Sequence, residues 1–265
     1  MRKHKCLFTS LLAFIISINA FASVEVIGSL KQVFNSNAGD VTKGQITIQN
    51  SEDKDQEVRI YQTDLLYNFQ DQTFYDEPGA NKRTNANWIQ YSPKTVVLKA
   101  KESRNVEFEI SIPKSDTILG TYWSVIMVEG VSPIDPTSAG ELNIRTSTRY
   151  AVLLVNEIQN RGKGMLKFYE PTLVKEEDGK KLYLAVDLLN EGDRYIGPEV
   201  TMELFDEDGN KVKTITTPKR GIYPATSTRF KLDLTGLPAK KTYTAMIVAA
   251  GQDEDVFGLE YTLYF

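Results

Sequence analysis

Short stretches of alternating apolar and polar residues recur along the whole chain, and no long stretch has the periodicity of an amphipathic helix. Alternation with a period of two is typical of β-strands that bury one face. Many short strands separated by turn residues favour a β-sandwich or a barrel. We therefore predict an all-β protein with strands at 45–49, 57–61, 95–99, 105–110, 122–128, 142–155, 165–168, 181–188, 199–205, 211–216, 229–234, 243–249 and 257–265.

The first residues have the three parts of an export signal. Basic residues precede an apolar stretch at 7–18, and residues 20–22 form the small-x-small pattern of a cleavage site. The apolar stretch is shorter than the roughly 20 residues that a transmembrane helix needs, and no later segment is long enough either. We therefore predict a signal peptide at 1–22 and a location in the periplasm or at the cell surface.

Cleavage would remove the only histidine and the only cysteine, His4 and Cys6. The mature chain would then have no disulfide, no Ser–His–Asp or Cys–His nucleophile, and none of the ligands that ordinary zinc sites use. Acidic residues that a glycoside hydrolase needs occur throughout the chain, but the sequence sets no pair of them apart. We predict a protein that is not an enzyme and has no metal or cofactor. A carboxylate-based hydrolase is the lesser alternative.

The net charge and length of the mature chain narrow the choice of partner and of domain number. It has 243 residues, of which 28 are basic and 35 acidic, a net charge of −7. A nucleic-acid or anionic-lipid partner would require a basic surface, so neither is expected. Without disulfides the fold must rest on its apolar cores, which this length allows for two domains of about 100 to 120 residues.

The two halves of the mature chain repeat one pattern. In each half a strand closed by proline is followed by Thr-Tyr at the start of an apolar strand, with Tyr122 in the first half and Tyr243 in the second. In immunoglobulin-like sandwiches such a tyrosine is buried and its hydroxyl bonds nearby backbone. Each half also has a strand that ends at an asparagine, Asn50 or Asn190. The predicted organisation is two tandem immunoglobulin-like β-sandwich domains at 23–158 and 165–265, joined by a polar linker at 159–164.

Two Asp-Gly pairs, Asp178-Gly179 and Asp208-Gly209, lie between alternating strands of the second half. This dipeptide supplies the positive φ that tight hairpins need. The acidic residues around the second pair lack the closing Glu of a calcium-binding EF-hand loop. Both pairs are therefore predicted to be hairpin turns.

With these strands in place, residues 25–158 resemble the amino-terminal domain of periplasmic pilus chaperones of the PapD type. Residues 30–34 are similar to the basic-x-Val-Phe opening strand of that family, and residues 40–50 to its next strand, which ends in Asn. Residues 88–109 resemble its Pro, apolar, acidic-turn and strand sequence, and residues 144–155 stand in the place of its edge strand. A similar order occurs in Gram-positive cell-surface proteins that accompany WxL-type proteins. The second half contains no chaperone-specific string.

The resemblance implies a partner and a site. Chaperones of this family hold the carboxy terminus of a subunit with two basic residues in the interdomain cleft, and donate an edge strand to the sheet of the subunit. Lys31 stands where the family has its first basic residue. The second corresponds to Arg149, or to Ala151 if the alignment shifts by two residues. The resemblance thus implies binding of an exported, pilin-like protein by Lys31, Arg145, Arg149, Tyr150, Val152 and Leu154.

Two points about this strand stay open at the level of the sequence. The residues that point outward are either Tyr150, Val152 and Leu154 or the alternating set of Ala151, Leu153 and Val155. The simpler interpretation of Arg145 and Arg149, and the one we favour from the sequence, is that they are solubilising charges on an exposed strand.

The main alternative binding segment is 61–91, which combines seven aromatic residues with many polar ones and is predicted to be a long loop. Exposed aromatic rings stack on sugars or anchor partner proteins. The simpler interpretation is that these rings pack in the core or cover a sheet edge. An adhesin-like or carbohydrate-binding surface module is therefore the alternative function.

Overall fold

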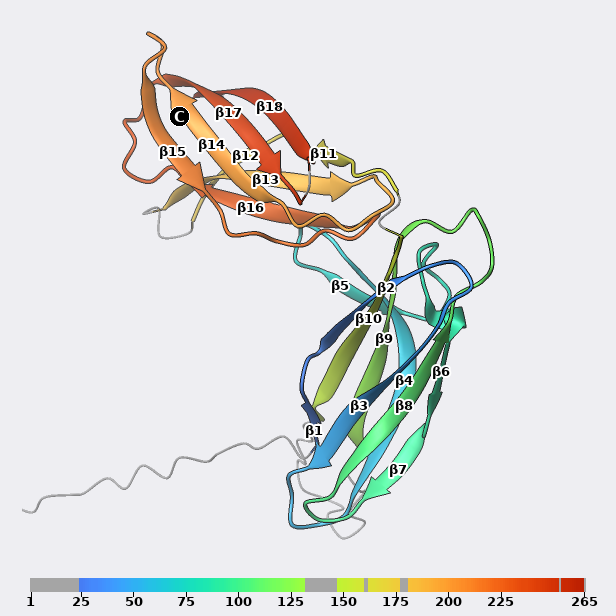
Figure 1. Ribbon diagram of the computed structural model, residues 1–265. Helices are drawn as coiled ribbons and strands as arrows, with labels where there is room; N and C mark the ends of the chain where they lie inside the picture. The colour runs from blue at the N-terminus through green and yellow to red at the C-terminus, as the bar shows by residue number, and fades with distance from the viewer. Residues whose placement is uncertain (1–23, 132–146, 160–161, 177–180, 253, 265) are drawn as a thin grey trace, which may run out of the picture.

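The computed structural model describes residues 24–131, 147–159, 162–176, 181–252 and 254–264. The predicted signal peptide, the Asp178-Gly179 turn and Arg145 lie outside these residues. The described residues form two β-sandwiches that lie end to end (Figure 1), and their one helix is a 3-10 turn, η1 (Ala86–Trp88). This confirms the predicted all-β class with two tandem sandwiches. No helix in the described part of the chain has the length and apolarity needed to cross a membrane.

The first domain contains the strands β1 (Val24–Ile27), β2 (Lys31–Ser36), β3 (Val41–Asn50), β4 (Gln56–Tyr67), β5 (Thr73–Asp76), β6 (Ile89–Ser92), β7 (Thr95–Leu98), β8 (Ser103–Ser111), β9 (Gly120–Val131) and β10 (Arg149–Ile158). One sheet has the order β1-β3-β8-β6. The other has the order β2-β10-β9-β4-β5, with β7 also paired to β4. Neighbouring strands are antiparallel except β2 and β10, which are parallel.

The second domain contains the strands β11 (Leu166–Phe168), β12 (Thr172–Lys175), β13 (Leu182–Asn190), β14 (Glu199–Phe205), β15 (Lys211–Thr216), β16 (Ser227–Asp233), β17 (Thr242–Ala250) and β18 (Val256–Tyr264). In one sheet β13 pairs with β11 and β12 along one edge and with β16 along the other. The second sheet has the order β15-β14-β17-β18.

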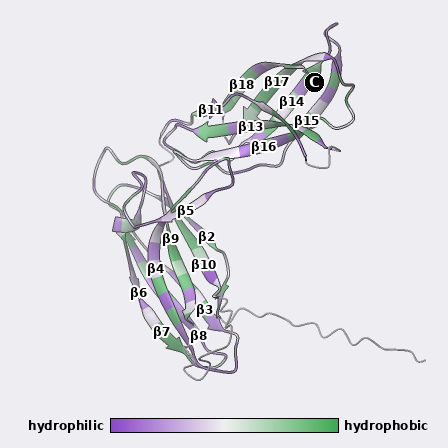
Figure 2. Cartoon of the chain, turned by 180° about the vertical axis from the view of Figure 1, so that it is seen from behind, coloured by the Kyte–Doolittle hydropathy of each residue, from purple (hydrophilic) through white to green (hydrophobic). Residues whose placement is uncertain are grey.

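Each sandwich has its own apolar core between its two sheets. Ile46, Ile60 and Leu154 are fully buried members of the first core, and Leu184 and Phe230 of the second. Apolar and polar residues alternate along many of the strands (Figure 2). Removal of these apolar side chains from water is the main favourable contribution to folding.

Two buried asparagines form the same turn in both domains. The side-chain amides of Asn50 and Asn190 donate to the backbone carbonyl four residues later, at 2.7 and 2.8 Å. Each side-chain oxygen accepts the backbone N–H two residues later, at 2.9 Å. Further donation to the carbonyls of Lys99 and Ile222 ties each turn to a distant segment. The two asparagines are therefore equivalent positions of the two sandwiches.

The predicted burial of the two equivalent tyrosines is confirmed only in the second domain. Tyr243 is buried, and its hydroxyl donates to the carbonyl of Pro238 at 3.1 Å. Tyr122 is only partly buried, and its ring lies against Trp88 at the end of the first core, 4.7 Å between centroids. The fully buried aromatic side chain of this strand is Trp123, which faces the second domain.

The Asp208-Gly209 hairpin is confirmed by the antiparallel pairing of β14 with β15. Gly209 has a φ of 81°, which favours glycine. The carboxylate of Asp206 accepts the backbone N–H groups of Asn210 at 2.8 Å and Asp208 at 3.1 Å. These donors stabilise the ionised form and lower the pKa of Asp206.

The prediction of a long loop at 61–91 is wrong. β4 continues to Tyr67 and turns back into β5, which pairs with it from Asp64↔Asp76 to Tyr67↔Thr73. The sequence conceals this strand because Gln62 and Asp64 occupy positions where a simple alternation would place apolar residues. Both polar side chains are bonded inside the domain instead. The amide of Gln62 donates to the carbonyl of Ala86 and to the hydroxyl of Ser124, each at 3.2 Å, and the bonds of Asp64 are described below.

Asn190→Ala should lower the free energy of unfolding of the second domain by about 1 to 3 kcal/mol, because it leaves buried backbone groups without partners. Urea unfolding of the full chain measures the change. The matched control is Asn105→Ala on the exposed face of β8, which should change the free energy by less than about 0.5 kcal/mol. Equal effects of the two substitutions would show that the turn of Asn190 is not a determinant of stability.

Candidate functional site between the two domains

β10 is paired with β9 along its whole length but with β2 over only part of it. The β9 register runs from Arg149↔Glu129 to Ile158↔Gly120. The β2 register begins at Leu153↔Lys31, where the N–H of Leu153 donates to the carbonyl of Leu30 at 2.8 Å. Among the described residues, 149–152 therefore have no strand partner on the β2 side. We call residues 149–152 the open segment.

The open segment is shorter than the sequence predicts because β2 pairs with the second part of β10. The chain reaches this position by passing from one sheet to the other between β1 and β2. β1 belongs to the four-stranded sheet, and the chain crosses at residues 28–30 to enter the six-stranded sheet as β2. Gly28 has a φ of 102° at this crossing. Residues 153–158 are consequently paired on both sides, which corrects the expectation that the strand is open up to residue 155.

The structure also decides which face of β10 points outward. Val152 and Leu154 are fully buried in the first core, and Tyr150 packs against it. Their side chains are thus on the inner face, and the expectation that they present a surface to a partner is corrected. On the outer face, Ala151 and Leu153 are partly exposed.

Lys31 lies at the contact between the two domains. Its ammonium nitrogen is 4.6 Å from the ring centroid of Tyr195 and 5.4 Å from that of Tyr223, and both tyrosines belong to the second domain. Burial lowers the pKa of Lys31, and the nearby carboxylate of Glu157 opposes this shift. The cation therefore stands in an aromatic corner between the two domains, with one acidic neighbour.

The same corner contains the Tyr223 side chain, whose hydroxyl donates no hydrogen bond within the described part of the chain. Burial raises the pKa of Tyr223, and the charge of Glu157 acts in the same direction. The Tyr223 hydroxyl is enclosed and has no hydrogen-bond partner in the described part of the chain. A buried hydroxyl without a partner is costly, and this one is enclosed in the contact between the two domains.

Arg149 does not share this corner. Its Nε lies 3.8 Å from a carboxylate oxygen of Glu129, and the hydroxyl of Tyr61 donates to that same carboxylate at 3.1 Å. Contact with Tyr61 and the charge of Glu129 raise the pKa of Arg149. Four residues separate Arg149 from Leu153, the register partner of Lys31, which is about 13 Å along a strand. The two predicted basic residues therefore lie at opposite ends of the exposed part of β10.

The domains meet through apolar side chains that the sequence analysis did not single out. Trp123 and Val155 of the first domain are fully buried with Tyr223 of the second, and the Trp123 and Tyr223 rings are 4.8 Å apart. The indole N–H of Trp123 donates to the carbonyl of Leu65 at 2.8 Å. The sequence contains an indication of this contact. Residues 122–128 are almost continuously apolar, as in a strand that is buried on both faces.

The β4–β5 hairpin extends this contact. The hydroxyl of Tyr67 donates to the carbonyl of Gly221 at 2.9 Å, and the N–H of Phe69 donates to the hydroxyl of Ser227 at 3.1 Å. The Phe69 ring packs against Tyr169, 5.3 Å between centroids. Tyr67 and Phe69, two aromatic residues of the 61–91 segment, thus connect the first domain to the second.

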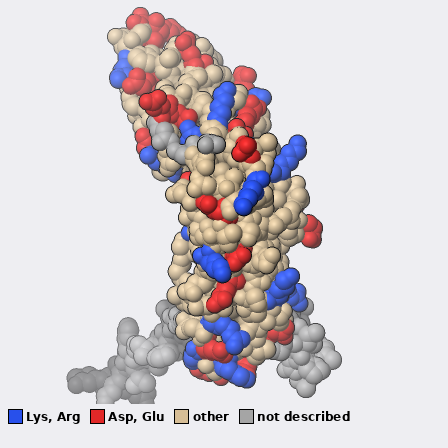
Figure 3. Space-filling model, turned by 45° about the vertical axis from the view of Figure 1, so that its right-hand side comes forward, with Lys and Arg blue, Asp and Glu red and all other residues tan. Residues whose placement is uncertain are grey.

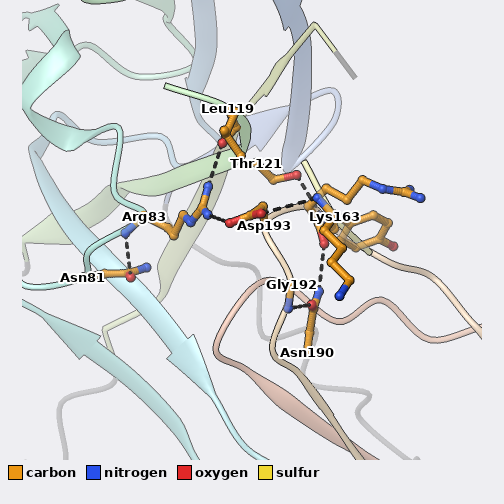
Figure 4. Close-up of polar contacts among 10 residues, drawn as sticks. Asn81, Arg83, Leu119, Thr121, Lys163, Asn190, Gly192 and Asp193 are labelled. Atoms are coloured by element: carbon orange, nitrogen blue, oxygen red, sulfur yellow. Dashed lines mark hydrogen bonds and ion pairs between the residues drawn. The ribbon is translucent and has the colours of Figure 1, made fainter. Parts of the chain in front are cut away.

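A polar clasp completes the interface (Figure 4). The guanidinium of Arg83 donates to the carboxylate of Asp193 and, at 2.6 Å, to the carbonyl of Leu119. The backbone carbonyl of Asp193 accepts the N–H of Thr121 at 2.9 Å. Gly120, with a φ of 77°, passes so close to Asp193 that a Cβ would overlap its carbonyl oxygen.

A groove of about 970 Å³ lies beside the open segment and contains polar and aromatic side chains of several strands. Its lining includes Tyr61, Tyr75, Tyr91, Met127, Arg149 and Ala151. The described residues contain no cluster of three or more potential His, Cys, Asp or Glu metal ligands. Basic and acidic side chains are interspersed on the face of the molecule shown in Figure 3.

No family model matches the sequence, and no curated protein matches it. Among solved structures, the chain is similar to one from a chaperone–tip adhesin complex of CFA/I fimbriae, at 13% identity and a TM-score of 0.50, covering 91% of this chain and 98% of the other. The class 5 fimbriae chaperone CfaA matches at 11% identity and a TM-score of 0.47, covering 90% and 98%. A chain of the CsuC–CsuE chaperone–tip adhesion subunit complex of Acinetobacter baumannii matches at 14% and 0.45, covering 79% and 90%. The first of these likenesses shows that the chain has a pilus-chaperone-like fold.

Gly120→Ala should destabilise the chain by about 1 to 3 kcal/mol more than Gly209→Ala, as measured by urea unfolding. Both glycines have a positive φ, so both substitutions carry the conformational penalty. Only Gly120 has a neighbouring domain in the way of the new methyl group, whereas Gly209 has open space. Equal destabilisation would show that the approach of Asp193 is not constrained at this point.

Proposed function

We propose that this protein is a non-enzymatic, exported binding protein that holds a partner protein by adding a strand of the partner to the open segment of β10. The observation that carries the proposal is the unpaired side of residues 149–152, whose other side is fixed by β9. Free backbone N–H and C=O groups at a sheet edge are a template for strand addition. The pilus-chaperone-like fold supports the proposal, and the predicted signal peptide is its basis for an exported, periplasmic or cell-surface location.

The surroundings of the open segment suggest the chemistry of the added strand. Ile27 and Leu30, which flank the crossing between β1 and β2, are about half exposed, and Ala151 and Leu153 face outward next to them. An added strand would continue the line of β2 and meet these apolar side chains at one end. The partner segment is therefore proposed to be extended and apolar at alternate positions, as in a pilin-like subunit.

Lys31 is proposed to receive a carboxylate of the partner. It is the cation of the aromatic corner, where it lies over the rings of Tyr195 and Tyr223. A cation that is partly removed from water contributes more to binding than an exposed one. Arg149 is exposed and already contacts Glu129, so its proposed role is to protect the strand edge from unwanted pairing.

A carbohydrate-binding role remains the second candidate, and the groove beside the open segment favours it. Tyr61, Tyr75 and Tyr91 line this groove together with carboxylate and amide side chains, which is a composition that suits stacking and hydrogen bonding to sugars. A glycan in this groove would not need the backbone groups of β10. The following substitution therefore separates the two functions.

Ala151→Pro should abolish partner binding while leaving the fold intact. The N–H of Leu153 points to the β2 side of β10, so the N–H of Ala151, two residues earlier, points to the same side, where it is open. Proline removes this donor and is tolerated where an edge N–H faces solvent. The measurement is photo-crosslinking in the periplasm from a benzoyl-phenylalanine at the neighbouring Ser147.

Ala151→Val is the matched control, because it keeps the N–H while it changes the side chain. It should crosslink as the parent chain does, and both variants should melt within a few degrees of the parent. Undiminished crosslinking by the proline variant would exclude strand addition at this position. Glycan binding that survives Ala151→Pro would favour the carbohydrate-binding function.

Lys31→Met should weaken binding of the crosslinked partner at least about tenfold, because it removes the cation of the aromatic corner but keeps an aliphatic stem against the tyrosine rings. Adding Arg149→Ala should change little more, since exposed ion pairs contribute about 0 to 1 kcal/mol. Lys43→Met, on the exposed side of β3, is the control and should bind normally. Normal binding by the Lys31 variant would contradict carboxylate recognition by this residue.

A further inference from the structure

Asp64 is a fully buried carboxylate at an inward-facing position of β4. The hydrogen bonds that it accepts within the described part of the chain come from neutral donors rather than from a cation. A buried carboxylate of this kind is costly compared with an apolar side chain. Its place in a core position therefore favours a role in fixing one particular local structure.

The local structure that Asp64 fixes is the segment at 79–84. One carboxylate oxygen accepts the backbone N–H of Gly79 at 3.1 Å and that of Asn81 at 2.7 Å. The other accepts the hydroxyl of Thr84 at 2.5 Å. These three bonds hold both ends of the segment against the first core.

This segment supplies Arg83, the side chain that contacts the second domain. The N–H of Arg83 donates to the side chain of Asn81 at 3.0 Å, and its carbonyl accepts the N–H of Trp123 at 3.0 Å. With its backbone held in this way, the guanidinium reaches Asp193 of the second domain (Figure 4).

Asn85, two residues after Arg83, contacts β10, the strand that contains the open segment. Its side-chain amide donates to the carbonyl of Leu154 at 3.1 Å and to the side chain of Asn156 at 2.8 Å, both in β10. Asn156 in turn donates to the hydroxyl of Ser36 in β2 at 3.3 Å. Asn85, which directly follows the segment at 79–84, is therefore bonded to β10 directly and to β2 through Asn156.

We infer that Asp64 is a positioning residue that couples the placement of the second domain to the strand β10. It holds Arg83 toward Asp193 and Asn85 toward β10, and in this way sets the position of the second domain relative to β10. The importance of this coupling for partner binding rests on the proposed function. The coupling itself is a property of the free chain and is measured without a partner.

The test is hydrogen exchange of the full chain carrying Asp64→Asn. The amide keeps the size of the side chain but has one acceptor oxygen where the carboxylate has two, so the bonds to the segment cannot all be kept. We expect exchange to become about tenfold faster at 79–88 and also at Thr121 and Tyr195, whose N–H groups bond across the two domains. Exchange at the core amides of Ile46 and Ile48 should be unchanged.

Asp76→Asn is the matched control, because Asp76 is the exposed register partner of Asp64 on β5. It should leave all these amides as in the parent chain. Faster exchange confined to 79–88, with Thr121 and Tyr195 unchanged, would overturn the coupling and leave Asp64 a purely local role.

Thr84→Val provides a second variant if Asp64→Asn unfolds the first domain. It removes one donor to the carboxylate and keeps the shape of the side chain. The same pattern, at a smaller magnitude, would support the coupling, and unchanged exchange at Thr121 and Tyr195 would overturn it. Failure of strand addition in the crosslinking experiment would leave these exchange results as they are, so the two proposals fail separately.

Discussion

The contact of Trp123 and Val155 with Tyr223 is the interaction on which the arrangement of this protein depends. It removes from water the part of the outer face of β9 and β10 around Trp123 and Val155, which a solitary sandwich would expose. With the second domain in this place, Tyr195 and Tyr223 stand over Lys31. The apolar contact supplies the attraction, since burial of aromatic area is non-directional and large.

Polar groups around this contact determine its orientation. The Arg83–Asp193 pair, the bonds of Tyr67 and the bonds of Asp64 each require one geometry, whereas apolar packing alone tolerates several. Charged groups that are partly removed from water contribute little net stability, because desolvation offsets their attraction. Their effect is to select one approach of the two domains, and with it the position of Tyr195 and Tyr223 over Lys31.

The limited length of the open segment has a physical reason as well. A long unpaired strand is prone to pair with other chains, and β2 covers all of β10 except residues 149–152. Arg149 adds a charge to the part that is left. A short edge of this kind leaves little unpaired backbone available for aggregation.

The sequence by itself determined the strands with regular alternation, the Asp208-Gly209 hairpin and the equivalent asparagines Asn50 and Asn190, because these depend on neighbouring residues and local turn chemistry. Tertiary structure alone decided which face of β10 is buried. Residues 150–155 are apolar at every position, so the sequence pattern indicates a strand but does not show which of its faces is buried. The partial cover by β2 and the meeting of Lys31 with Tyr195 likewise depend on segments far apart in the chain, which no local pattern brings together.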